Sequence, residues 1–100
     1  MVKRKVTTPP AETVPRSWIE TEGSPLPLGV TWYGQEEYFN FSLFSRYATG
    51  VTLLLYPDAD VRTPILQYQF DYLKNKTGRV WHCCIPRAQA PAARYYAYRV

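Results

Sequence analysis

The residues best suited to chemistry lie side by side in this sequence: the only histidine, His82, is followed by both cysteines, Cys83 and Cys84. Imidazole and thiolate groups bind zinc, and a cysteine beside a histidine can act as an activated nucleophile. On a β-strand, however, consecutive side chains point to opposite faces, so only His82 and Cys84 would share one. Zinc needs three or four protein ligands, and the sequence has no second histidine and no third cysteine. We therefore predict no metal site and interpret the cysteines as small buried apolar residues.

Carboxylates offer another kind of chemistry, because a pair of Asp or Glu side chains can hydrolyse a glycosidic bond. The pairs in this sequence lie in or beside expected turns, where carboxylates are usually solvated: Glu20/Glu22, Glu36/Glu37 and Asp58/Asp60. The sequence also has no glycine-rich phosphate loop and no serine-nucleophile motif. We predict that this chain alone has no catalytic residues and no cofactor.

The elements that must position these side chains are short strands. Aromatic residues make up 16% of the 100 residues, and no segment sustains the apolar spacing of an amphipathic helix. Alternation and turn residues predict strands near these ranges: 30–32, 38–45, 51–57, 65–73, 79–86 and 94–100. Six or seven short strands about ten residues apart predict an all-β fold, an antiparallel immunoglobulin-like β-sandwich.

The clearest alternation is in the segment 38–45. Phe39, Phe41 and Leu43 share one face of the expected strand, and Asn40 and Ser42 lie on the other. This period of two predicts a strand with one buried side and one solvated side.

Composition divides the chain into two parts. Residues 1–17 are rich in charge, threonine and proline, which predicts a flexible or extended leader before a β-sandwich module at 18–100. Four of the twelve basic residues lie in the first sixteen positions, so the net charge of +4 leaves the remainder close to neutral. We therefore expect no nucleic-acid partner.

The sequence also indicates where the protein works. No run of 18 or more apolar residues is present, so we expect no membrane span and no membrane partner. Two cysteines are too few for a disulfide framework, which favours a reducing, cytoplasmic location. The supply of apolar side chains exceeds what one small sandwich needs, which indicates a face that lies against something else.

Four fragments in order resemble the N-terminal domain of isoamylase-type glycogen debranching enzymes. They are "PLPLGVTW", "FNFSLFSRYATGVTLLLYP", "TGRVWHCCIP" and "YYAYRV", and together the resemblance covers residues 23–100. It implies an early-set immunoglobulin-like sandwich classed with the family 48 carbohydrate-binding modules. In that family the module precedes a catalytic α-amylase-type barrel that hydrolyses α-1,6 branches in glycogen or amylopectin.

The resemblance implies a non-catalytic module whose partner is the barrel of the same parent chain, with glycogen or another α-glucan as a possible ligand. Glycan-binding members of the module family carry a Gly-x-Phe-Asn-x-Trp-like loop, which has no counterpart here. Packing on the barrel and shaping the α-glucan groove is therefore the expected role. We expect Trp32, Tyr33, Trp81 and His82 to be exposed near that glycan or domain-docking surface, because of their aromatic and polar content.

Two alternatives remain open from the sequence. One is a stand-alone glycan-binding module, in which exposed aromatic rings stack on sugar rings. The other is a protein-interaction sandwich that has no connection to carbohydrate.

Overall fold

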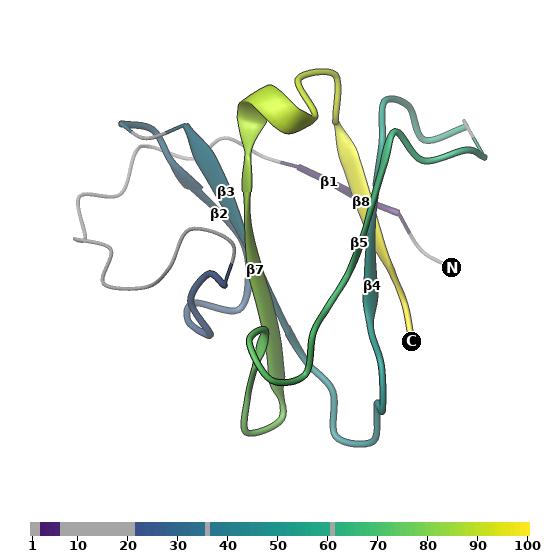
Figure 1. The fold of residues 1–100 in the computed structure, drawn as a ribbon. Helices are drawn as coiled ribbons and strands as arrows, with labels where there is room; N and C mark the ends of the chain where they lie inside the picture. Colours follow the sequence, from purple (N-terminus) through teal and green to yellow (C-terminus); the bar gives the residue numbers. More distant parts are fainter. Residues whose placement is uncertain (1–2, 7–21, 36, 61) are drawn as a thin grey trace.

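Two antiparallel sheets face each other in this protein (Figure 1). The structure, a computed structural model, describes residues 3–6, 22–35, 37–60 and 62–100. The first sheet has the order β1-β8-β4-β5: β1 (Arg4–Lys5), β8 (Tyr95–Arg99), β4 (Thr52–Tyr56) and β5 (Leu66–Gln69). The second has the order β2-β3-β7-β6: β2 (Gly29–Tyr33), β3 (Tyr38–Phe44), β7 (Val80–Pro86) and β6 (Lys76–Thr77). The predicted all-β antiparallel sandwich is confirmed.

The core lies between the sheets and follows the alternation of the strands. Leu53 and Leu55 of β4 point inward from the first sheet, and Phe41, Trp81 and Cys83 point inward from the second. All five are almost completely buried. Full burial of one large apolar side chain stabilises a fold by roughly 1.5–3 kcal/mol, so these inward positions account for the pairing of the sheets.

Three short elements were not predicted. β6 lies in the expected loop 74–78 and pairs with the start of β7, and η1 (Arg87–Gln89) forms a single 3-10 turn between β7 and β8. β1 lies in the expected leader, where Arg4 and Lys5 pair with β8. Residues 7–17 of the leader lie outside the described residues, and the boundary between leader and module stays a prediction.

The outer face of the second sheet differs from the sequence prediction. Asn40, Ser42 and His82, expected on a solvated face, are buried, and Asn40 is 0% exposed. Residues 22–25, here called the covering segment, are hydrogen-bonded to this face. The main-chain N–H of Ser24 donates to Asn40 Oδ1 at 2.7 Å, and Asn40 Nδ2 donates to the Ser24 carbonyl at 2.9 Å. Ser42 Oγ donates to the Pro25 carbonyl. These bonds satisfy the buried polar groups, so both faces of the sheet can be buried.

Gly23 allows the covering segment to approach this closely. Its φ of +71° lies in the left-handed region, which a residue with a Cβ occupies at a cost of about 1–2 kcal/mol. A Cβ at this position would lie 2.5 Å from the Cys83 carbonyl carbon and 2.6 Å from Asn40 Oδ1. The main chain of β7 blocks the space that any larger residue needs.

We predict that Gly23→Ala lowers the free energy of unfolding by about 2 kcal/mol or more, because backbone strain and steric overlap add. Denaturant titration of the chain measures this change. Gly50→Ala is the matched control, since a Cβ at Gly50 meets nothing within 4 Å. The control should change stability by less than about 0.5 kcal/mol. Equal effects of the two substitutions would show that the covering segment contributes little.

Candidate interaction surfaces

The four residues predicted for a glycan or docking surface lie in three different environments. Tyr33, Trp81 and His82 are only 3%, 1% and 4% exposed, so the expectation that they are exposed is wrong. Trp32 is partly buried and lines a pocket. Strand alternation explains the difference: Trp81 points into the core, whereas Tyr33 and His82 point to the outer face of a sheet that is buried on both sides.

Trp81 is a core residue. Its ring centroid lies 6.3 Å from that of Phe70, and Lys76 Nζ lies 5.0 Å from the ring centroid of Trp81. Its indole Nε1 is buried and has no hydrogen-bond partner within the described part of the chain. A direct contact of Trp81 with a partner would require the sandwich to open.

His82 holds the covering segment in place. Its Nδ1 lies 2.6 Å from the Glu22 carbonyl oxygen, and its Nε2 lies 2.9 Å from Thr77 Oγ1. A carbonyl oxygen only accepts, so Nδ1 carries the hydrogen and Nε2 accepts from the Thr77 hydroxyl. His82 thus links residue 22 to β6.

The cysteines are both buried thiols. Cys83 belongs to the core, and burial raises the pKa of its thiol well above the ordinary value, which keeps it protonated. Cys84 lies on the opposite face of β7, opposite Asn40 in the neighbouring strand. The described residues contain no group of three or more His, Cys, Asp or Glu side chains that could hold a metal ion.

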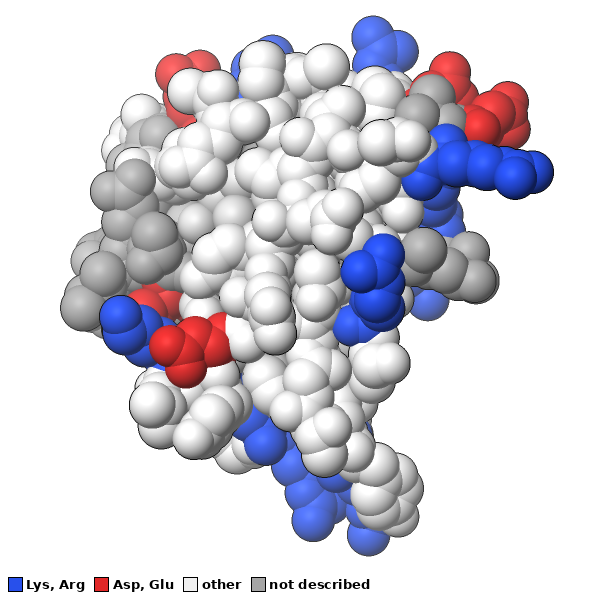
Figure 2. All heavy atoms as spheres, turned by 45° about the vertical axis from the view of Figure 1, so that its right-hand side comes forward, with Lys and Arg blue, Asp and Glu red and all other residues white. Residues whose placement is uncertain are grey.

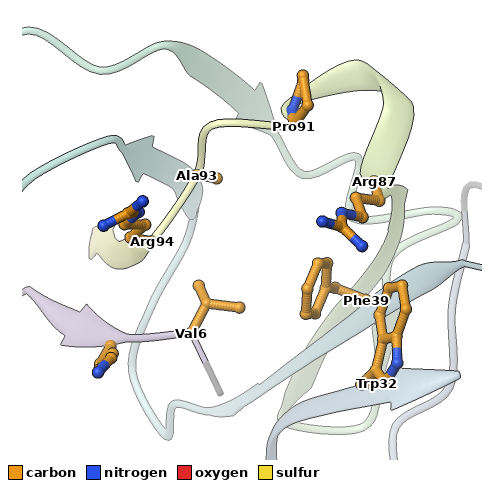
Figure 3. Close-up of a pocket in the computed structure, with 8 residues that line it drawn as sticks. Val6, Trp32, Phe39, Arg87, Pro91, Ala93 and Arg94 are labelled. Atoms are coloured by element: carbon orange, nitrogen blue, oxygen red, sulfur yellow. The ribbon is translucent and has the colours of Figure 1, made fainter. Parts of the chain in front are cut away.

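Two pockets lie between the edges of the two sheets, along the seam where β1 faces β2. The cationic pocket has a volume of about 610 Å³ and is lined by Lys5, Trp32, Phe39, Arg87 and Arg94, among others. Figure 3 shows Trp32, Phe39 and Arg87 on one side of it and Arg94 on the other.

The second, the apolar pocket, has a volume of about 420 Å³ and is lined by Leu28, Leu43, Phe44, Tyr96 and Tyr98, among others. Leu28 and Phe44 are 55% and 54% exposed, which is unusual for large apolar side chains that share one hollow. The surplus of apolar residues seen in the sequence is partly located here. Sequence reasoning missed this pocket, because no periodic pattern brings residue 28 beside residues 44 and 98.

Tyr98 lines the apolar pocket together with Arg4. Its hydroxyl is buried, with no hydrogen-bond partner among the residues that the structure describes. Burial is the largest cause that raises the pKa of Tyr98 far above its ordinary value of 10.0. Burial also raises the pKa of Tyr96 beside it. A buried hydroxyl without a partner costs about 1–3 kcal/mol, and, as for Trp81 Nε1, a neighbouring molecule could contact it only if the packing around it opened.

Charged side chains lie around the edge of the face in Figure 2, whose centre is a broad uncharged surface. The lysines and arginines on that face lie in several separate places, one of them inside the border on the right and others together at the bottom. No helix within the described ranges is long and apolar enough to cross a membrane.

Comparison with known proteins gives the family. A sequence model of the family described as Carbohydrate-binding module 48 (Isoamylase N-terminal domain) matches residues 27–100. The chain is 43% identical over 65 residues to isoamylase 2, chloroplastic, of Arabidopsis thaliana, which covers 65% of the chain and 7% of that protein. It is 38% identical over 82 residues to the glycogen debranching enzyme of Serratia proteamaculans, which covers 80% of the chain and 11% of that enzyme.

A solved structure supports the same fold. The chain superposes on GBS pullulanase SAP, crystallised in complex with maltotetraose, with a TM-score of 0.53 and 19% sequence identity, over 73% of this chain and 10% of that one. The chain thus spans about a tenth or less of the length of the two relatives named above. The family match covers the whole sandwich from β2 to β8. The chain belongs to the carbohydrate-binding module 48 family, the isoamylase N-terminal domains.

Proposed function

We propose that this chain is a non-catalytic module of a glycoside hydrolase of the glycogen-debranching type, whose α-amylase-type barrel hydrolyses α-1,6 branches in glycogen or amylopectin. The module packs against that catalytic domain and helps to shape the groove that admits α-glucan. The observation that carries this proposal is the apolar pocket, where the exposed side chains of Leu28 and Phe44 share one hollow. The names of the relatives, isoamylase and glycogen debranching enzyme, support this parent enzyme and this substrate class.

The energetics favour an occupied apolar pocket. Leu28 and Phe44 each retain about half of their exposed surface, so covering them would contribute roughly 1 kcal/mol per side chain. A domain surface offers both an apolar patch and polar groups at its rim.

The position of the pocket also supports docking within one chain. β8 contributes Tyr96 and Tyr98 to the apolar pocket. A catalytic domain that follows β8 in a parent enzyme would therefore emerge close to the surface that we propose it covers. A short connection of this kind raises the effective concentration of the two surfaces.

We propose a reducing compartment for the protein, and the cytoplasm is the simplest choice. Cys83 and Cys84 are thiols on opposite faces of β7, so they cannot form a disulfide with one another without rearrangement of the strand. The plant relatives of Arabidopsis and rice are named as chloroplastic, which makes a plastid the alternative for a plant parent.

In the parent enzyme, the double variant Leu28→Ser and Phe44→Ser is expected to lower the melting temperature and to reduce activity on amylopectin, because the docked surface loses apolar contact. In the isolated chain the same changes should cost up to about 2 kcal/mol, because each side chain is nearly half buried there, so the loss in the parent enzyme should exceed the loss in the isolated chain. Leu73→Ser is the control, as Leu73 is 76% exposed and lines neither pocket. Unchanged melting and activity in the parent double variant would argue against docking through this surface.

Tyr98→Phe is expected to raise the stability of the isolated chain or leave it unchanged. The substitution removes a buried hydroxyl that has no partner among the described residues, so the gain should be at most about 1 kcal/mol. Thermal unfolding of the wild-type chain and the variant measures the change. A loss of stability would show that the hydroxyl is hydrogen-bonded within the fold.

The raised pKa of Tyr98 adds a pH dependence to the isolated chain. Below about pH 10 Tyr98 is protonated in both the folded and unfolded states, so it contributes no pH dependence. Above that pH the unfolded chain releases the proton while the fold retains it, so wild-type stability falls. The stability of the Tyr98→Phe variant should fall less steeply between pH 10 and 11 than the stability of the wild-type chain. Parallel stability curves for the two proteins would show that the pKa of Tyr98 is the same in both states.

Trp32 favours a second function, direct binding of α-glucan. Its ring is partly exposed in the cationic pocket, and aromatic faces stack on the apolar faces of sugar rings. We expect retention of the chain on immobilised amylopectin, reduced severalfold by Trp32→Ala. Tyr47→Ala is the control for nonspecific adsorption through exposed aromatic rings, because Tyr47 is 83% exposed and lines neither pocket. Elution of the wild-type chain without retention on amylopectin would show that the chain does not bind α-glucan.

A further inference from the structure

We propose that the cationic pocket binds a phosphate ester on a sugar ring, that is, a phosphorylated unit of an α-glucan. This inference rests on the second function proposed above, the binding of α-glucan, and adds the chemical class of sugar that the pocket selects. The phosphate would lie between the cations of the two walls, and the sugar ring would lie against Trp32.

The charge of the pocket is the first argument. Lys5, Arg87 and Arg94 all line it, and no Asp or Glu of the described residues does. Within the described part of the chain, none of these three side chains forms an ion pair. Like charges that surround one hollow repel each other and attract an anion, and the effect is strongest where salt screening is weak.

The type of cation is the second argument. A guanidinium group is planar and offers two parallel N–H donors to one phosphate, a fit that an ammonium group does not provide. Arg87 lies on the wall that carries Phe39, and Arg94 lies on the facing wall, so an anion between them can be held from both sides (Figure 3).

The backbone beneath both arginines is fixed by hydrogen bonds. The N–H of Arg87 donates to the Glu37 carbonyl at 2.9 Å, which ties η1 to the turn between β2 and β3. The N–H of Arg94 donates to the Tyr56 carbonyl at 2.9 Å, and its own carbonyl accepts from the N–H of Val6 at 2.7 Å. The two guanidinium groups thus extend from anchored main chain, which lowers the entropy that binding must overcome.

The aromatic wall is the third argument. The ring centroids of Trp32 and Phe39 lie 4.6 Å apart with an interplanar angle of 42°, so the two rings support each other. The pocket volume of about 610 Å³ lies within the range of small-molecule sites and exceeds what a lone phosphate ion fills. Space, ring and charge together fit a ligand that has both a ring and an anionic group. The family's carbohydrate binding favours a sugar as that ring.

Binding of four probes to the 100-residue chain tests the inference: phosphorylated maltodextrin, unphosphorylated maltodextrin of equal length, inorganic phosphate and adenosine monophosphate. Tryptophan fluorescence or calorimetry at low salt gives the affinities. We expect phosphorylated maltodextrin to bind at least about tenfold more tightly than the unphosphorylated form, as one charge-assisted contact provides. The preference should decline as salt is raised.

The double variant Arg87→Gln and Arg94→Gln should remove the preference and leave the affinity for unphosphorylated maltodextrin unchanged. Arg62→Gln with Arg79→Gln is the charge-matched control, because both arginines are exposed and neither lines the pocket. This control should retain the preference for the phosphorylated probe. Loss of the preference in the control as well would mean that overall charge, not the pocket, attracts the phosphate, and would overturn the inference.

The other outcomes separate this inference from the function on which it rests. Equal affinity for the two maltodextrins would overturn phosphate selection and leave α-glucan binding in place. Absence of binding to both would overturn both. Inorganic phosphate that binds as tightly as phosphorylated maltodextrin would show that the sugar plays no part. Tighter binding of adenosine monophosphate would make the ligand a nucleotide and overturn the assignment to sugar.

Discussion

The contact between the covering segment and the outer face of the second sheet is the interaction on which the rest of the structure depends. Asn40 is completely buried, and its amide would be costly without the two hydrogen bonds to the main chain of Ser24. His82 adds a bond to the Glu22 carbonyl. Because this face is covered, the sheet is buried on both sides there. Contacts with partners must then use other surfaces, above all the seam between β1 and β2.

The same constraint decides what the histidine and the two cysteines do. Cys83 points into the core, where burial raises the pKa of its thiol, and His82 points the other way, toward Glu22 and Thr77. Cys84 shares the outer face with His82 but lies opposite Asn40. Three consecutive residues thus have three environments, and each environment is filled by protein. These three side chains therefore pack and form hydrogen bonds within the fold.

Alternation and turn residues predicted most of the fold, since each of the six longer strands overlaps an expected range, although β5 ends at Gln69 and not at residue 73. Alternation missed β1 and β6, because two residues are too few to show a period. Alternation also predicted that the outer face of the second sheet, which carries Asn40 and Ser42, is solvated, whereas this face is buried. The bond from His82 to Glu22 joins residues 60 positions apart, and no local pattern reports such a contact. Of the predicted surface residues, Trp32 lines a pocket. The sequence did not predict that Arg87 and Arg94 line the same pocket. Exposed arginines are common, and no sequence pattern shows which of them the fold brings together.

Among the described residues, β1 and β2 are edge strands of different sheets and are not paired with each other. The side chains along these two edges line the two pockets. Near Phe44 the lining is mostly apolar and includes Arg4, whereas near Arg87 it is aromatic and cationic. The two pockets share no lining residue. A domain could therefore cover the apolar pocket without using any residue of the cationic one, so a single short edge can serve both docking and recognition of a charged sugar.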